Sequence, residues 1–126
     1  MRILILEDDL GTLTKLLEYL ARLENSLDLK VSVTVFSEFW QVEEHLNSGT
    51  KEKFDFILLD RDCKIGGSFH ILNLDKFPEA VVIGISSVPR YNQELRDKGI
   101  KLIVDKDYNK LDEFAQKVML LIREYD

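Results

Sequence analysis

A short apolar run in the middle of the chain constrains its fold more than any other feature. Residues Phe56 to Leu59 are all aromatic or aliphatic, and the run stops abruptly at Asp60. An unbroken run of this length indicates a strand covered on both faces, as in a parallel sheet. Ligands of open parallel sheets bind just beyond the carboxyl ends of the strands, so Asp60 occupies a place where functional groups gather. Taken alone, the same carboxylate could simply open a loop or cap a helix.

Strand and helix patterns alternate along the whole chain. Strand-like patterns also occur in four other segments, at residues 3–6, 31–35, 80–85 and 100–104. Helices are predicted after the strands, at residues 13–23, 39–46, 68–72, 91–98 and 111–122. This alternation predicts an α/β fold, with a doubly wound five-stranded parallel sheet that carries helices on both faces. Valine at every second position of residues 31–35 places that strand toward an edge of the sheet.

Length and composition narrow the class of protein. The length suits one domain, and we expect residues 1–126 to form it with no second domain attached. A net charge of −6 and the lack of a Lys/Arg run argue against direct nucleic-acid binding. The single cysteine, Cys63, excludes an internal disulfide and suits a reducing compartment. With no apolar run of membrane-spanning length and no signal peptide, a cytoplasmic protein is expected.

Polar groups follow four of the five predicted strands. They are Glu7 and Asp8 after the first strand, Asp60 after the third, Ser86 after the fourth and Lys106 after the fifth. The carboxyl ends of these strands can be neighbours in a doubly wound sheet. Crowded carboxylates repel one another unless a cation or a proton is present, and hard oxygen ligands of this kind suit Mg²⁺. A metal, a lysine and a hydroxyl around one carboxylate are what phosphoryl transfer to that carboxylate requires.

With these features the chain resembles a response-regulator receiver domain over nearly its whole length. Four segments carry the resemblance in the right order and spacing, namely residues 3–8, 54–60, 82–87 and 99–106. The resemblance implies a flavodoxin-like fold of the receiver type. It also implies a stand-alone two-component protein, in which residues 1–126 are the receiver domain and no output domain is present.

The resemblance assigns a role to each acidic residue of the site. Asp60 corresponds to the phosphoacceptor. Glu7 and Asp8 correspond to the acidic pair that holds Mg²⁺, with Asp8 as the direct ligand and Glu7 acting through water. The backbone carbonyl of Asp62 would complete the protein ligands of the metal.

The resemblance also identifies the residues that would contact the phosphoryl group, along with departures from the family pattern. Ser86 stands at the switch hydroxyl position and Lys106 at the phosphate-contacting lysine. The aromatic switch position of the family is Ile103 here, and Asp107 replaces the proline that often follows the lysine. Ile103 cannot make the polar contact that a tyrosine makes, so the route by which a signal leaves the site is expected to be unusual.

Three functions are compatible with this sequence. The first is a phosphorelay protein that receives phosphate from a histidine kinase or phosphotransfer protein, signals by protein contact and is not itself an enzyme. The second is a receiver-fold binding module whose phosphosignalling is atypical or lost. The third is a phosphatase of the haloacid-dehalogenase type, because Asp60-Arg61-Asp62, Ser86 and Lys106 resemble the motifs of that family. Against the third, the acidic pair precedes the nucleophile and no cap insertion is present.

The last helix offers a surface for a downstream partner. Its apolar residues form a stripe broader than one face of a sheet covers, and Leu120 falls on the opposite side among charged residues. We therefore expect a weak homodimer or a heterologous complex through Met119, Leu120 and their neighbours. On the second helix, Trp40 is expected to be partly covered and His45 to lie on the solvated face.

Overall fold

A computed structural model of the chain describes residues 1–49, 52–60 and 74–126. The strands are β1 Arg2–Leu6, β2 Ser32–Phe36, β3 Phe56–Leu59, β4 Val81–Ser86 and β5 Leu102–Asp105. The helices are α1 Leu10–Leu27, α2 Phe39–Asn47, α3 Pro89–Asp97 and α4 Leu111–Tyr125, with a short 3₁₀ helix, η1, at Leu74–Lys76. Among these described helices, none has the length and apolar character needed to cross a bilayer.

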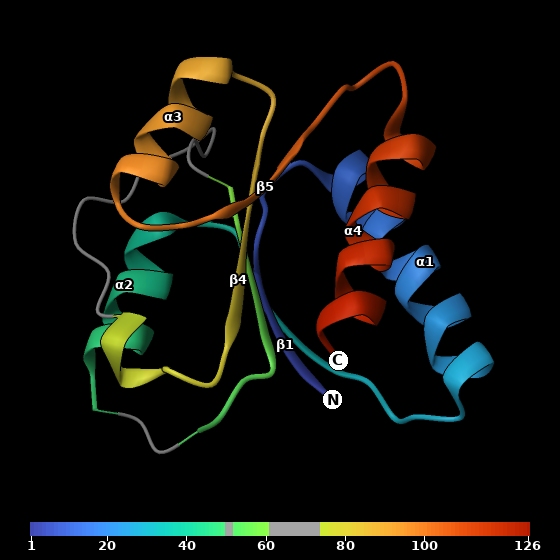
Figure 1. The fold of residues 1–126 in the computed structure, drawn as a ribbon, viewed down its shortest axis with the longest axis horizontal. Helices are drawn as coiled ribbons and strands as arrows, with labels where there is room; N and C mark the ends of the chain where they lie inside the picture. Colours follow the sequence, from blue (N-terminus) through green and yellow to red (C-terminus); the bar gives the residue numbers. More distant parts are fainter. Residues whose placement is uncertain (50–51, 61–73) are drawn as a thin grey trace.

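The five strands form one parallel sheet in the order β2-β1-β3-β4-β5. Helices α1 and α4 cover one face of the sheet, and α2 and α3 cover the other (Figure 1). The predicted fold class is therefore confirmed, and so is the edge position of the strand near residues 31–35. The helix predicted at residues 68–72 lies outside the described residues.

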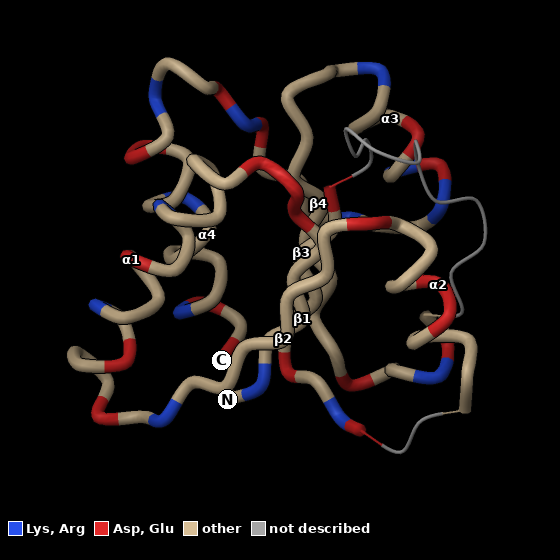
Figure 2. Tube along the Cα trace, turned by 180° about the vertical axis from the view of Figure 1, so that it is seen from behind, with Lys and Arg blue, Asp and Glu red and all other residues tan. Residues whose placement is uncertain are grey.

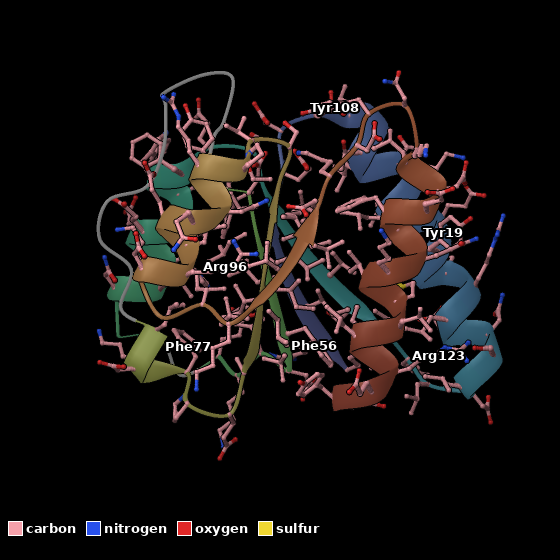
Figure 3. All side chains as sticks on the ribbon, turned by 45° about the horizontal axis from the view of Figure 1, so that its top comes forward. Tyr19, Phe56, Phe77, Arg96, Tyr108 and Arg123 are labelled. Atoms are coloured by element: carbon pink, nitrogen blue, oxygen red, sulfur yellow. The ribbon has the colours of Figure 1, made fainter. Side chains whose placement is uncertain are left out.

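Successive residues of the inner strands point to opposite faces, and both faces are buried. Ile3 and Ile5 of β1 face α1 and α4, whereas Leu4 and Leu6 face α2 and α3. Strand β3 repeats this pattern, and its Phe56 packs on the α1 and α4 side, opposite Phe77 (Figure 3). Burying each of these side chains contributes about 1.5–3 kcal/mol. Continuous apolar runs are therefore what a sheet covered on both faces requires.

Close packing of α3 against the sheet depends on a glycine in β4. A Cβ atom on Gly84 would lie 2.7 Å from the Cδ1 atoms of both Leu95 and Ile103. Real Cβ atoms do not approach other carbons so closely, so only glycine fits here without a shift of the neighbours. The part of α3 that carries Leu95 is thereby packed closely against β4 and β5.

The structure corrects the prediction that Met119 is an exposed contact residue. Met119 is only 7% exposed, whereas Leu120 is 64% exposed, as predicted. Helix α4 packs against α1 as well as the sheet, and Arg123 of α4 donates a hydrogen bond to the Ser26 hydroxyl at 2.9 Å. A helix with two packing partners needs a broad apolar stripe, so the width of the stripe does not by itself indicate an external partner.

The prediction for His45 was also wrong. Its imidazole lies between two phenylalanine rings, with centroids 5.5 Å from Phe36 and 5.8 Å from Phe54. The neighbouring rings come from the end of β2 and the approach to β3, which the helical pattern of α2 alone does not reveal. Trp40 is half exposed, as expected, and its indole N–H donates to Glu38 at 2.6 Å.

Candidate functional site

The acidic residues converge because of the register of the central strands. Leu6 of β1 pairs with Leu59 of β3, so the next residues, Glu7 and Asp60, leave the sheet together. The Asp60 amide still donates to the Leu6 carbonyl at 3.1 Å, which fixes the backbone of Asp60 beside β1. Figure 2 shows the acidic stretch after β1 at the end of the sheet opposite the two chain termini. The sequence-predicted carboxylates are thus brought to one edge of the sheet.

Lys106 joins the site from the end of β5. Its Nζ donates to Glu7 Oε1 at 2.7 Å and to Asp60 Oδ2 at 3.2 Å, and all three side chains are buried. Burial by itself lowers the pKa of the Lys106 ammonium. The attraction of Glu7 and then of Asp60 outweighs burial and raises that pKa above its ordinary value. Lys106 is therefore held as a cation between the two carboxylates, with the ring of Tyr108 centred 5.3 Å from Nζ.

Glu7 is engaged through both carboxylate oxygens. Oε1 accepts from Lys106, and Oε2 accepts from the backbone amides of Asp8 and Asp9, each at 3.1 Å. Asp9 has a different task, because its Oδ2 accepts from the amide and the hydroxyl of Thr12 and caps α1. Asp8 and Asp9 are half-buried, whereas Glu7 is almost completely buried.

Carboxylate oxygens of Glu7, Asp8 and Asp60 all lie within 4.8 Å of one another. Three carboxylates share this space with one ammonium, so full ionisation leaves an excess of negative charge there. A hard divalent cation with oxygen ligands and remaining waters would balance that charge, and the partial exposure of Asp8 leaves room for water. The donor set therefore fits Mg²⁺. Asp62, the remaining predicted ligand, lies outside the described residues.

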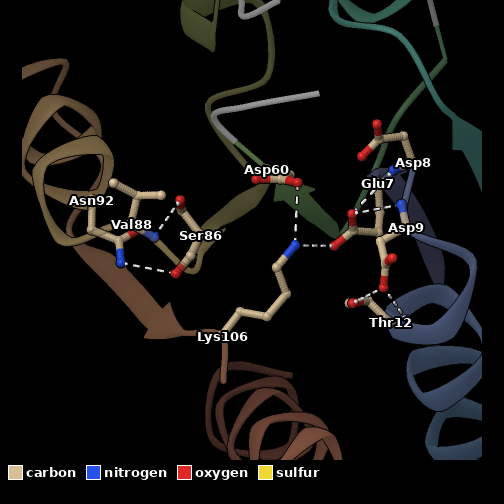
Figure 4. Close-up of polar contacts among 9 residues, drawn as sticks. All are labelled: Glu7, Asp8, Asp9, Thr12, Asp60, Ser86, Val88, Asn92 and Lys106. Carbon is tan, nitrogen blue, oxygen red and sulfur yellow. Dashed lines mark hydrogen bonds and ion pairs between the residues drawn. The ribbon is translucent and has the colours of Figure 1, made fainter. Parts of the chain in front are cut away.

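Ser86 lies at the buried end of β4, on the other side of Asp60 from the acidic stretch (Figure 4). Its Oγ accepts from the Val88 amide at 3.2 Å. Its backbone carbonyl accepts from the Lys106 amide at 3.0 Å, which ties the ends of β4 and β5 together. Ser86 and Lys106 thus lie at the same edge of the sheet as Asp60. That they contact a phosphoryl oxygen stays a prediction.

Ile103, the predicted switch position, is separated from these polar groups. Its side chain points to the α3 face of the sheet and packs over Gly84 beside Leu95. A partly buried aliphatic side chain in this place fills space and has no hydrogen-bonding group. That signal output through residue 103 differs from that of an aromatic residue stays a prediction.

Sequence reasoning missed Asn92, which lies in the first turns of α3. It is 1% exposed, and its Nδ2 donates to the Ser86 carbonyl at 3.1 Å and to Asp105 Oδ1 at 2.6 Å. The sequence held one signal for this position: Asn92 is three residues before the buried Leu95, so the two share a helix face. A polar residue on the inner face of a helix needs partners, and here the partners belong to the site.

Comparisons with known proteins bear on the fold. No model of a protein family matches the sequence, and no curated protein matches it. The structure is similar to the BeF3-activated receiver domain of DrrB, with 20% identity, a TM-score of 0.69 and coverage of 98% of this chain and 95% of that one. The phosphorylated cyanobacterial phytochrome response regulator RcpA gives 16% identity, a TM-score of 0.69 and coverages of 98% and 92%.

A third similar structure contains a metal complex. TrrA, a response regulator of Thermotoga maritima in complex with Mg²⁺-BeF, gives 21% identity, a TM-score of 0.56 and coverages of 95% and 97%. The chain therefore has the fold of response-regulator receiver domains over nearly its whole length. At these identities the likeness establishes the fold, and the roles of individual residues rest on the geometry of the site.

Proposed function

We propose that this chain is a phosphoryl-accepting signalling domain in which Asp60 becomes an acyl phosphate. One observation carries the proposal. Asp60 is buried at the end of the central strand, within 3.2 Å of the Lys106 ammonium and within a cluster formed with Glu7 and Asp8. The receiver fold of the chain supports a role in phosphorelay signalling.

The proposed reaction moves one phosphoryl group. A carboxylate oxygen of Asp60 attacks phosphorus, and a P–O bond to Asp60 forms as the P–N bond of a phosphohistidine donor breaks. The departing imidazole keeps the electron pair of that bond and takes up a proton. A histidine kinase or a phosphotransfer protein would supply the phosphohistidine, and acetyl phosphate would react in the same way with loss of acetate.

Residues around Asp60 can stabilise the group that is transferred. The Lys106 ammonium already contacts Asp60 and can donate to a phosphoryl oxygen without crossing the site. The Ser86 hydroxyl can donate to a second oxygen after a rotation of its side chain. Asp8 and Asp60, with Glu7 and the Asp62 carbonyl, would hold Mg²⁺, which when bound offsets negative charge on the phosphoryl oxygens.

The two acidic residues after β1, Glu7 and Asp8, have different roles in this proposal. Of the acidic pair, Asp8 would be the direct ligand of the metal, because the oxygens of Glu7 are already committed to Lys106 and to two backbone amides. Glu7 therefore orients Lys106, and it would act on the metal through water. The protein itself is modified, so it is a regulatory acceptor and its neighbours in the comparisons are regulatory as well.

One observation favours a variant of this function. Ile103 packs beneath α3 where the family resemblance places an aromatic switch residue. A binding module with unusual phosphosignalling would have this feature. Such a module would also differ from the phosphoryl acceptor proposed above, because its contacts with partners would not change when Asp60 is phosphorylated.

The proposal is tested by comparing single and repeated turnover. The protein is incubated with Mg²⁺ and either acetyl phosphate or p-nitrophenyl phosphate, and released product is counted per chain. An acceptor takes up at most one phosphoryl group per chain from acetyl phosphate and releases it slowly, and it gives no sustained release of nitrophenol. Sustained hydrolysis of the ester, abolished by Asp60→Asn, would instead establish a phosphatase and contradict the proposed function.

A further inference from the structure

A single buried amide connects the site to helix α3. Asn92 Nδ2 donates one hydrogen bond to the Ser86 carbonyl and a second to Asp105 Oδ1, at 3.1 and 2.6 Å. Ser86 carries the site hydroxyl, and Asp105 directly precedes Lys106. The two hydrogens of one NH₂ group therefore contact the segments that carry Ser86 and Lys106. Figure 4 shows the contact with the Ser86 carbonyl.

The Ser86 carbonyl is a junction between these elements. It accepts from the Asn92 side chain and also from the backbone amide of Lys106, at 3.0 Å. A shift of Lys106 or of Ser86 relative to Asp60 changes the geometry of at least one bond made by Asn92. Because Asn92 lies near the start of α3, such a change acts at the end of the helix that packs over the site.

Packing alone does not explain an amide at residue 92. The Asn92 Oδ1 atom is buried and has no hydrogen-bond donor within reach among the described residues. A buried acceptor without a partner is destabilising. Leucine has nearly the same shape as asparagine and would fill the position without this penalty. The value of the amide must therefore come from the two bonds that its NH₂ group makes.

We propose that Asn92 is a positioning residue that couples the geometry of Ser86 and Lys106 to the position of helix α3. The inference rests on the proposed function for its purpose, since a phosphoryl group on Asp60 would draw on both Ser86 and Lys106. In this chain the amide supplies a polar link between α3 and Asp105 at the end of β5. Helix α3 is then the element that reports the state of Asp60.

The first test needs no phosphate and no metal. Hydrogen exchange of the α3 amides is measured in the wild type and in Lys106→Met, and again with Asn92→Leu present in both. Lys106→Met should change exchange at the start of α3 when Asn92 is intact, and that change should be lost when Asn92→Leu is also present. An equal change with and without Asn92→Leu would overturn the inference, whatever the outcome of the phosphorylation experiments.

A second pair of variants tests the same link without changing Lys106, so the result does not depend on whether Lys106→Met folds. The Asp105 side chain is exposed, so Asp105→Ala should leave the fold intact while removing one acceptor of Asn92. Asp105→Ala and Asn92→Leu should alter α3 exchange in the same way, and their combination should add nothing further. Additive effects would mean that the two residues act on α3 independently, which contradicts the proposed link.

The last arm links the inference to the state of Asp60. Beryllofluoride with Mg²⁺ is added to the wild type, to Asn92→Leu and to Gln93→Leu. The last variant is the control, because the exposed Gln93 side chain donates to Asp97 of the same helix. Hydrogen exchange of the α3 amides should change on beryllofluoride binding in the wild type and in the control. This change should be lost in Asn92→Leu, although we expect urea unfolding to show that this variant is at least as stable as the wild type. A response that survives in Asn92→Leu would refute the inference.

Discussion

The Lys106 ammonium and the Glu7 carboxylate form a buried ion pair with an Nζ–Oε1 distance of 2.7 Å, across 99 positions of sequence. The two residues follow β5 and β1, and β3 and β4 lie between these strands in the sheet. The ion pair therefore spans the carboxyl edge of the sheet, and Asp60 lies within reach of the same ammonium. We therefore expect both the stability of this edge and the proposed phosphoryl transfer to depend on Lys106.

Replacing Lys106 with methionine should destabilise the protein strongly when no metal is present. Removing one partner of a buried ion pair leaves uncompensated charge, with a loss of about 3–5 kcal/mol. Urea unfolding measures the loss, and Lys117→Met on the exposed face of α4 is the matched control. Millimolar Mg²⁺ should recover part of the loss in Lys106→Met, because the metal offers the carboxylates another cation. No recovery would argue against a metal site at this cluster.

The stability that Lys106 supplies should disappear only at strongly alkaline pH. The pKa of Lys106 is raised in the folded protein above its unfolded value of 10.5. Its contribution is therefore complete below pH 10.5 and is lost as the pH rises through the folded pKa. The difference in unfolding free energy between the wild type and Lys106→Met should be constant at neutral and mildly alkaline pH and shrink above pH 10.5. A difference that already shrinks near neutral pH would contradict the raised pKa.

Asp8→Asn should weaken Mg²⁺ binding more than Glu7→Gln. Both oxygens of Glu7 are committed to Lys106 and to backbone amides, whereas Asp8 is half-buried beside Asp60. Isothermal titration calorimetry compares the two variants with the wild type. The Asp9→Asn variant is a control, because Asp9 caps α1 and points its carboxylate at Thr12. Equal losses in Asp8→Asn and Glu7→Gln would refute the distinction between direct and indirect ligands.

Leu120→Glu should leave the fold intact and reduce self-association, if the exposed face of α4 forms a weak homodimer. Leu120 is 64% exposed, and beside it Ile103, Val104 and Leu121 line a hollow in the surface. Sedimentation velocity over a range of concentrations measures association, with and without phosphorylation. Leu10→Glu is the matched control, because Leu10 is 74% exposed on α1. A wild-type protein that is monomeric throughout would eliminate the homodimer and leave only a heterologous partner.

Much of the fold and of the site could be predicted from the sequence because both follow from strand ends. Apolar runs covered on both faces identify the inner strands, and parallel strands bring their carboxyl ends to one edge. Those two rules place Glu7, Asp60 and Lys106 close together before any coordinates are known. The pairing of individual oxygens could not be predicted, because it depends on register and side-chain torsions.

The misjudged residues share one physical cause. His45, Met119 and Asn92 all lie on helices, where a periodic pattern shows which positions share a face but not how many elements cover that face. Met119 is buried because α4 packs on both α1 and the sheet. His45 is half-buried because two phenylalanine rings flank it. Asn92 was assigned no role from the sequence, yet its amide donates to Ser86 and Asp105. In each case the environment of the side chain is set by neighbours that lie outside its own helix.

The central claim is that Asp60 accepts a phosphoryl group with the help of Mg²⁺. Intact-mass measurement after incubation with acetyl phosphate tests it most directly, on the wild type and on Asp60→Asn, each with Mg²⁺ and with excess chelator. We predict that the wild type with Mg²⁺ gains the mass of one phosphoryl group, and that the chelated sample and Asp60→Asn gain none. A wild type that stays unmodified where an ordinary receiver domain is labelled, or equal labelling of Asp60→Asn, would contradict the account.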